Sequence, residues 1–182
     1  MRKRLQIDLR IAATLIAAAL LGAVSTVSPL SAAGPACTLS PYEHDASLKV
    51  LRCGEGLVVR SSRDAKYHPL AAAGRETPEA IELDEGALLI EFHPSAQQSE
   101  FQILTPLAIA AVRGTKWAVE VTAARTSTLV SAGAVSVANR RLRQSVVLTK
   151  GQGVDISPSD TSVVPKQWGQ ARIQALLSRL GE

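Results

Sequence analysis

Thr105-Pro-Leu-Ala-Ile-Ala-Ala-Val-Arg-Gly-Thr-Lys-Trp-Ala-Val-Glu-Val121 is the stretch that decides the fold. A Thr-Pro turn enters an apolar run that ends at Val112, and Arg113-Gly114-Thr115 then interrupts the run. From Trp117 to Val121 large apolar residues take every second position, which is typical of a strand buried on one face. Glycine between two strand-forming segments indicates a bulge, a corner or a close approach of two backbones. The stretch therefore predicts two strands that meet at a β corner.

Short apolar runs separated by turn residues continue on both sides of this corner. The expected strands of the second half are 101–105, 109–112, 117–121, 128–130, 135–137, 146–148 and 154–156, with Gly133, Gly151 and Gly153 among the turns. In the first half, 48–53 and 57–60 predict one hairpin, and 81–83 and 88–92 predict a second around Asp84-Glu85-Gly86. Residues 61–79 and 93–100 show no period and are expected as loops. This spacing predicts an all-β fold: a single compact β-sandwich or a short β-solenoid-like domain.

The last residues follow a helical period. After Pro165, a single helical stripe contains Trp168, Ile173, Leu176, Leu177 and Leu180. Gly181 is well placed to end the helix. We expect one C-terminal amphipathic helix of about four turns that packs on its own domain, because burial of an apolar face supplies most helical stability.

The first 33 residues have the pattern of an export signal. Four basic residues lie among the first ten, an apolar region runs over 11–24, and small residues occupy Ser31-Ala32-Ala33. The pattern predicts a signal peptide over residues 1–33, cleaved near Ala33. The alternative is an uncleaved anchor, because residues 11–30 are long enough to span a bilayer.

Charge and cysteine content restrict the class of protein. The leader contains four cations and one anion, so its removal lowers the net charge from +4 to +1. We therefore expect no general attraction of the mature protein to nucleic acid. About 149 residues of the 182 remain, enough for one domain. In an oxidising compartment Cys37 and Cys53 predict a disulfide that closes a loop of about 17 residues, worth about 3 kcal/mol. A metal site that includes His44 is the alternative.

Four motifs occur in order across residues 101–157. They are Thr105-Pro106, Val112-Arg113-Gly114-Thr115, Gly133-Ala-Val-Ser-Val137 and Leu148-Thr-Lys-Gly151-Gln152. In these motifs the chain resembles the FecR-type periplasmic domain of bacterial cell-surface signalling proteins. The resemblance implies a periplasmic location and a mainly structural role for the motif residues. We therefore divide the chain into a signal peptide (1–33), N-terminal hairpins and loops of the same domain (34–100), the FecR-type core (101–157), and a linker with the helix (158–182).

Complete regulators of this type are expected to have further parts. The resemblance implies that a complete regulator consists of a cytoplasmic anti-sigma segment, one membrane helix, the periplasmic domain and a C-terminal signalling module. Here ten residues precede the apolar segment and about 25 follow the β core. We expect a free-standing exported domain rather than a transmembrane regulator.

Reactive residues do not form a recognisable catalytic pattern. No serine is framed as Gly-x-Ser-x-Gly, and the three histidines, at 44, 68 and 93, are widely spaced. Glu91 and His93 are two potential ligands at strand spacing, which is too few for a metal site. We therefore expect no catalytic residue, no metal and no cofactor.

Two basic features allow both a structural and a binding interpretation. We expect the guanidinium of Arg113 to bind backbone carbonyls across the corner, near the core; the alternative is an exposed side chain that binds a partner's carboxylate. The cluster Arg140-Arg141-Leu-Arg143 is expected to be a solvated turn, with binding of anionic lipid headgroups as the alternative.

These observations favour an exported, non-enzymatic β-domain that binds another protein of the bacterial envelope. Addition of a partner strand to an exposed sheet edge would supply the contact, because main-chain pairing needs no special side chains. Membrane contact is expected only through an uncleaved leader or the Arg140–Arg143 cluster, and nucleic acid is not expected as a partner. The alternatives are a structural or cell-wall (glycan)-associated scaffold module and, third, an unrecognised hydrolase or metal enzyme.

Overall fold

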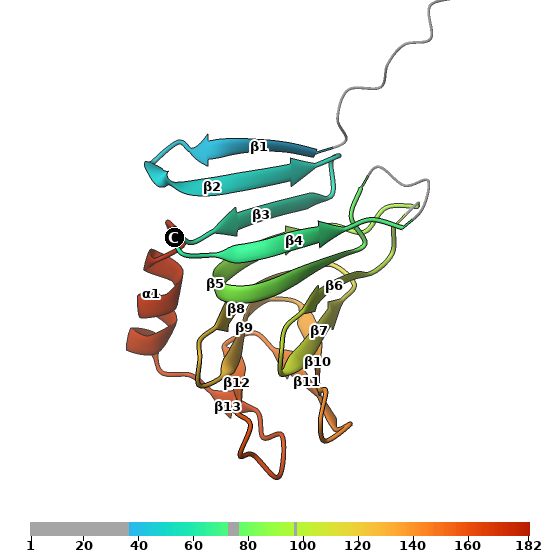
Figure 1. Cartoon of the computed structure of the whole chain (residues 1–182), viewed down its shortest axis with the longest axis vertical. Helices are drawn as coiled ribbons and strands as arrows, with labels where there is room; N and C mark the ends of the chain where they lie inside the picture. Colours follow the sequence, from blue (N-terminus) through green and yellow to red (C-terminus); the bar gives the residue numbers. More distant parts are fainter. Residues whose placement is uncertain (1–36, 73–76, 97) are drawn as a thin grey trace, which may run out of the picture. The chain divides into compact units, whose positions relative to one another are not determined.

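One long strand, β5 (Ala80–Phe92), takes part in both layers of the structure (Figure 1). The computed structural model describes residues 37–72, 77–96 and 98–182, so the predicted signal peptide lies outside the described residues. Strands dominate this part of the chain, and the single helix within it, α1 (Gln170–Ser178), lies near the C-terminus. The predicted all-β fold is confirmed. The helix in the described part of the chain is not long and apolar enough to cross a bilayer.

The strands form one curled sheet whose two ends make two layers. Layer A has the order β1-β2-β3-β5-β8-β9-β12-β13, with bounds β1 Cys37–Tyr42, β2 Asp45–Cys53, β3 Leu57–Ser61, β8 Thr115–Val121, β9 Thr126–Ala132, β12 Gln152–Ile156 and β13 Lys166–Gln167. Layer B has the order β4-β5-β6-β7-β10-β11, with bounds β4 Lys66–Leu70, β6 Phe101–Leu104, β7 Ala108–Val112, β10 Ala134–Asn139 and β11 Ser145–Thr149. Among the described strands all pairs are antiparallel except β5 with β6. This antiparallel pairing agrees with the predicted β-sandwich and differs from the parallel coils of a solenoid.

A bend in β5 connects the two layers, where the sequence predicted a hairpin. Before the bend, residues 80–82 pair with β6; after it, residues 86–92 pair with β8. Gly86 has a φ of +86°, and a Cβ there would lie 2.5 Å from the backbone of Ala65. Ser62 completes the pairing at the bend, because its hydroxyl accepts a hydrogen bond from the Ala87 N–H (2.9 Å). The prediction of a turn at Asp84-Glu85-Gly86 was wrong because the glycine bends the strand without reversing it.

The inner faces of the two layers form one apolar core. Phe92 packs against Phe101 with ring centroids 5.6 Å apart, and Phe101 packs edge-on against Trp117 at 6.3 Å. All three side chains are buried, which confirms that Phe101 and Trp117 belong to the core. The alternation read in the sequence thus places Trp117, Val119 and Val121 on the inner face of β8.

The short strands predicted in the second half of the chain are all present, whereas two strands of the first half were missed. Residues 61–79 were expected as a loop, but β4 pairs with β5 within this segment. β1 was not predicted; it pairs with β2 so that Cys37 lies opposite Cys53. These two cysteines form the predicted disulfide, with a Cα–Cα distance of 4.0 Å. β1 and β4 are edge strands rich in polar residues, which show little alternation.

The helix covers the outer face of layer A. Leu89, Ala118 and Leu129 project from that face and are buried against Trp168, Leu176 and Leu180. Packing on its own domain is therefore confirmed. The helix is shorter than the four turns expected, because residues 166–167 pair with β12 and Gly169 is extended.

Candidate functional site

The Thr-Pro motif closes the turn between β6 and β7. The Ala108 N–H donates to Thr105 Oγ1 (2.9 Å), and the Thr105 N–H donates to the Ala108 carbonyl (2.9 Å). The hydroxyl of Thr126 lies 3.1 Å from Thr105 Oγ1, which connects this turn to layer A. Arg140 donates to the Thr105 carbonyl (3.0 Å). Pro106 follows at an exposed position, where its fixed φ suits a turn.

The Arg-Gly-Thr motif forms the corner between β7 and β8. Gly114 has a φ of +98°, and a Cβ at Gly133 would lie 2.9 Å from the Gly114 carbonyl oxygen. The two glycines therefore let the β7–β8 and β9–β10 turns approach closely. Thr115 donates from its hydroxyl to the Ala134 carbonyl at 3.4 Å. All of these contacts lie within the chain and join neighbouring turns of the sheet.

Arg113 differs from its expected position. Its side chain is 77% exposed, and its Nε donates to Glu100 Oε1 at 2.7 Å. The prediction of carbonyl contacts near the core was wrong, because Val112 points inward and the next side chain must therefore point outward. The exposed alternative describes the position of Arg113 better, although its carboxylate partner belongs to the same chain.

Gly151 of the last motif and Gly153, just after the motif, make room for the C-terminal segment. A Cβ at Gly153 would lie 2.3 Å from Trp168 Cε2, and one at Gly151 would lie 2.3 Å from Gln167 Nε2. Gln152 Oε1 accepts hydrogen bonds from the Thr149 N–H (2.9 Å) and hydroxyl (3.0 Å). Gly153 therefore leaves space for the indole of Trp168 on layer A, and the motif itself closes the β11–β12 turn.

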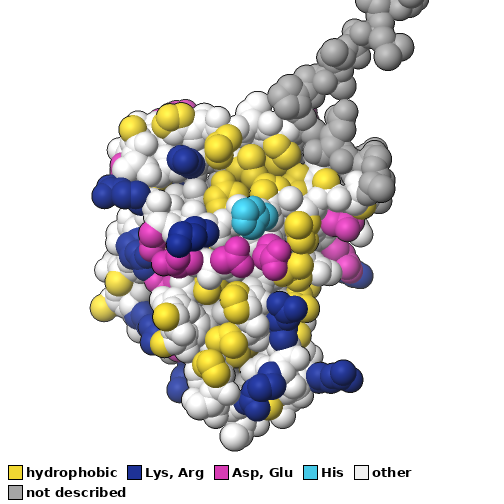
Figure 2. Space-filling view, viewed as in Figure 1, with side chains coloured by type: hydrophobic (Ala, Val, Ile, Leu, Met, Phe, Trp, Pro, Cys, Tyr) yellow, Lys and Arg dark blue, Asp and Glu magenta, His cyan; other side chains and the backbone are white. Residues whose placement is uncertain are grey.

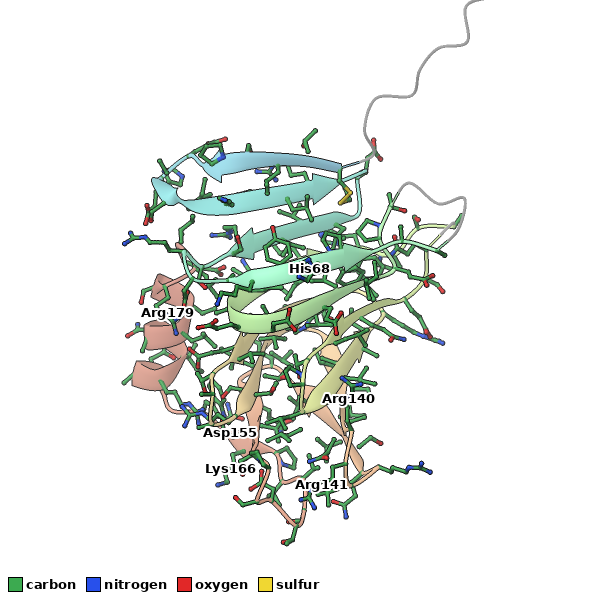
Figure 3. The ribbon with its side chains drawn as sticks, in the orientation of Figure 1. His68, Arg140, Arg141, Asp155, Lys166 and Arg179 are labelled. Atoms are coloured by element: carbon green, nitrogen blue, oxygen red, sulfur yellow. A yellow bond between two sulfur atoms is a disulfide. The ribbon has the colours of Figure 1, made fainter. Side chains whose placement is uncertain are left out.

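Charged side chains hold both ends of α1 on layer A (Figure 3). Arg172 donates to both carboxylate oxygens of Asp155, at 2.9 and 2.6 Å, and its Cζ lies 3.5 Å from the centre of the Trp168 ring. Burial raises the pKa of Asp155, but hydrogen bonds from Arg172 and Ser127 outweigh it, so the pKa lies below its ordinary value. At the other end Arg179 pairs with Glu120.

The basic cluster after β10 is partly used inside the protein. Arg141 donates to the Asp160 carbonyl, while Asn139 Oδ1 accepts hydrogen bonds from the N–H groups of Arg141 and Leu142, both at 2.9 Å. Arg143 is exposed and has a φ of +54°. The cluster is therefore an ordered turn; Figure 3 shows Arg140 and Arg141 where it follows β10. The sequence predicted a solvated turn; Arg140, Arg141 and Arg143 are indeed exposed there, although the first two also donate to backbone carbonyls of the same chain.

Titratable side chains in the described part of the chain do not form a metal site. No group of three or more His, Cys, Asp or Glu residues comes together there. Glu91, one of the two suggested ligands, accepts salt bridges from Lys116 (3.1 Å) and Arg60 (3.6 Å). His93 is exposed in a loop. Glu91 is therefore explained by its salt bridges, and His93 by its exposure to solvent.

A groove of about 570 Å³ lies between β4 and the inner face of β1–β3. Leu39, Leu51, Tyr67 and Pro69 supply much of its apolar lining. Figure 2 shows hydrophobic side chains gathered beside the histidine that Figure 3 labels as His68. β4 forms one side of the groove, but Pro69 has no N–H to offer to another strand.

Four strands of the described sheet have one unpaired edge: β1, β4, β11 and β13. β1 and β4 contain proline, at Pro41 and Pro69, and β13 has two residues. β11, Ser-Val-Val-Leu-Thr, contains neither proline nor charge, and its Val147 is 63% exposed. Proline, charge and shortness are the devices that protect edge strands from pairing with other chains. β11 lacks all three, and the sequence alone did not reveal this because edge status depends on the order of the strands.

Comparison with solved structures gives the fold. A crystal structure provisionally described as an anti-sigma factor, from Parabacteroides distasonis ATCC 8503, has a TM-score of 0.57 at 15% identity, covering 71% of this chain and 60% of that chain. A second structure with the same description and organism has a TM-score of 0.49 at 14% identity, covering 79% and 61%. This chain thus spans less than two thirds of the length of either protein. No curated protein matches the sequence.

The sequence itself matches a known family over half its length. Residues 45–136 match the family described as FecR protein. The match begins with β2 and ends within β10, so it starts well before residue 101, where the four motifs placed the core. It includes the Thr-Pro turn, the Arg-Gly-Thr corner and the bent strand β5. The chain belongs to the FecR protein family.

Proposed function

We propose that this chain is an exported, non-enzymatic FecR domain that binds a protein of the bacterial envelope in a signalling-associated role. The free edge of β11 is the observation that supports protein binding most directly. An edge without proline or charge offers backbone groups to which an extended segment of another protein can pair. Membership of the FecR family and the anti-sigma description of the structural neighbours support the signalling context.

The expected compartment is the periplasm. The Cys37–Cys53 disulfide suits an oxidising environment, where small domains gain stability from such bonds. The sequence of residues 1–33 has the pattern of a cleaved export signal. Fractionation of cells that express the full chain, followed by mass spectrometry of the purified protein, tests both points. Recovery in the cytoplasmic fraction with free thiols would contradict the proposed location.

The polar and close-packed contacts of the motif residues support a structural role for those residues. Thr105, Gly114, Thr115, Gly133 and Gly151 contact the protein's own backbone or side chains. We infer that they hold the corner and the turns in place, while partners bind at a sheet edge. No group among them is arranged for proton transfer or nucleophilic attack.

Site-specific crosslinking in cells tests protein binding. A photoreactive amino acid at position 147 should crosslink to an envelope protein, and identification of the adduct by mass spectrometry names it. Position 164 is the matched control, because Val164 is also an exposed valine (55%) but lies outside the strands. Equal yields from the two positions, or no adduct at 147, would refute the proposal.

A further inference from the structure

The direction of the backbone groups along β11 follows from contacts at its two ends. Before the strand, the Asn139 N–H donates to the Gln144 carbonyl (2.8 Å), so Gln144 faces β10. At its end, the Thr149 N–H donates to the side chain of Gln152, so Thr149 faces away from β10. Residues of an antiparallel pair alternate between these two directions. Both ends therefore place the N–H and C=O of Ser145 and Val147 on the free edge.

These groups have no other partner within the described residues. β11 pairs only with β10, and no hydrogen bond from a described loop or side chain reaches the backbone of Ser145 or Val147. The side chain of Val147 lies on the outer face of layer B, because Leu148 next to it is buried in the core. An incoming strand would thus find free backbone groups beside an exposed apolar side chain.

Charges at the ends of β11 make a second copy of this chain a poor occupant. Arg143 precedes the strand and Lys150 follows it, both are exposed, and in the described part of the chain neither has a carboxylate within salt-bridge distance. An antiparallel pair of β11 strands centred on Val147 would place Lys150 of each copy close to Arg143 of the other. Like charges that face each other across strands are destabilising. The same two cations would attract a strand that has carboxylates near both ends.

We propose that the free edge of β11 binds an extended segment of another protein that has an apolar residue opposite Val147 and acidic residues three or four positions away on each side. This inference rests on the proposed protein-binding function and specifies the partner's chemistry. Backbone pairing with Ser145 and Val147 supplies affinity, and the apolar residue packs on Val147. Arg143 and Lys150 select the acidic flanks.

Two synthetic peptides test the proposal: Glu-Glu-Thr-Thr-Val-Thr-Thr-Glu-Glu and its counterpart with lysine at the four charged positions. Binding to the mature protein is measured by fluorescence anisotropy and by amide shifts in NMR. We expect the acidic peptide to bind at least about tenfold more tightly than the basic one at low salt. The difference should shrink as salt rises, because screening weakens exposed charge pairs. Equal affinities, or shifts confined to β1 or β4, would overturn the proposal.

Variants separate the backbone contribution from the charges. Val147→Pro removes the free N–H without breaking the ladder to β10, and the Arg143→Ala, Lys150→Ala double variant removes the two cations. Each should weaken the acidic peptide about tenfold. Lys166→Ala, on the other edge strand β13, is the matched control and should leave affinity unchanged. Should Val147→Pro fail to fold, a peptide N-methylated at its central valine and at the residues two positions away tests the same contact.

The crosslinking experiment distinguishes failure of this inference from failure of the proposed function. Capture of an envelope protein at position 147, together with no preference for the acidic peptide, would overturn the partner chemistry and keep the function. No capture and no peptide binding would overturn both. Retained affinity in the peptide N-methylated at its central positions would show that backbone pairing on β11 is not the mode of binding.

Discussion

Both layers are built of similar strands, but their outer faces differ in whether other parts of the chain cover them. On layer A, Leu89, Ala118 and Leu129 lie beneath α1 and are at most 1% exposed. On layer B, no helix of the described chain covers the outer face, where Ile109 is half-buried and Val147 is 63% exposed. Layer A is therefore closed by the chain's own C-terminal segment. Layer B keeps a surface and an edge that another protein can use.

The cover of layer A depends on polar contacts as much as on apolar ones. Leu176 is the one buried residue within α1. The segment is held further by Trp168, by Arg172 on Asp155, and by Arg60, which donates to the Gly181 carbonyl at 3.0 Å. A short helix with few buried residues needs such contacts, because its intrinsic stability is low.

Removal of the Trp168 ring should have the largest effect on the difference between the covered layer A and the open layer B. Trp168→Ala empties the space above Gly153 and removes the ring beneath Arg172, so we expect a loss of about 3–5 kcal/mol in the free energy of unfolding. Urea unfolding followed by circular dichroism measures it. Val164→Ala, at an exposed valine in the segment that leads to β13, should change the free energy by less than about 0.5 kcal/mol. A Trp168→Ala protein as stable as the wild type would show that the segment does not close layer A.

Gly153→Ala should have a smaller effect on the same contact. The new Cβ would lie 2.3 Å from Trp168 Cε2 and 2.8 Å from the Thr128 carbonyl, so the indole must move. We expect a loss of about 1–3 kcal/mol, the usual cost of overpacking. Gly169→Ala is the matched control, because nothing lies within 4 Å of a Cβ there and its φ is −69°. Equal thermal stability of the two alanine variants would contradict the close seat for Trp168.

Asp155→Asn should have the smallest effect and should alter the acid response. Loss of the carboxylate weakens its contact with Arg172 by about 1 kcal/mol, the size expected for a partly exposed pair. Because the pKa of folded Asp155 lies below its ordinary value of 3.8, the carboxylate stabilises the fold above that pH and loses this effect as the pH falls further. Thermal melts between about pH 7 and pH 3 should therefore fall less steeply in Asp155→Asn.

The exposed ion pair of layer B provides the control for Asp155. Glu85→Gln removes the carboxylate that accepts a bond from Lys66 at 2.6 Å, where both side chains are more than half exposed. This variant should melt like the wild type at neutral pH, because exposed pairs contribute little. If Glu85→Gln lowers stability as much as Asp155→Asn does, the polar contacts of α1 have no special importance.

The sequence predicted the strands of 101–157 because their burial alternates locally. Trp117 to Val121 needs no knowledge of its neighbours to be recognised as half-buried. β4 was missed because Lys66-Tyr-His-Pro-Leu70 is a polar edge whose pairing partner lies on β5. The bend at Gly86 resembled a turn because local residues do not show whether a strand continues in a second layer.

The candidate site was only partly predictable. Strand addition at an exposed edge was expected, but which edge is free depends on the order of the strands, and this follows from long-range pairing. Arg113 was assigned to the core from its apolar neighbours, although the alternation from Val112 already places it outside. The positions of Arg143 and Lys150 at the two ends of β11 are visible in the sequence; their relation to a free edge is not.

Residue-resolved amide hydrogen exchange on the mature protein tests the free edge of β11 most directly. Val146 and Leu148 should exchange slowly, because their N–H groups face β10, while Ser145 and Val147 should exchange as fast as solvent-exposed amides. Addition of the acidic peptide should then slow Ser145 and Val147 alone within this strand. Slow exchange of Val147 in the free protein, equal to that of Leu148, would contradict the account.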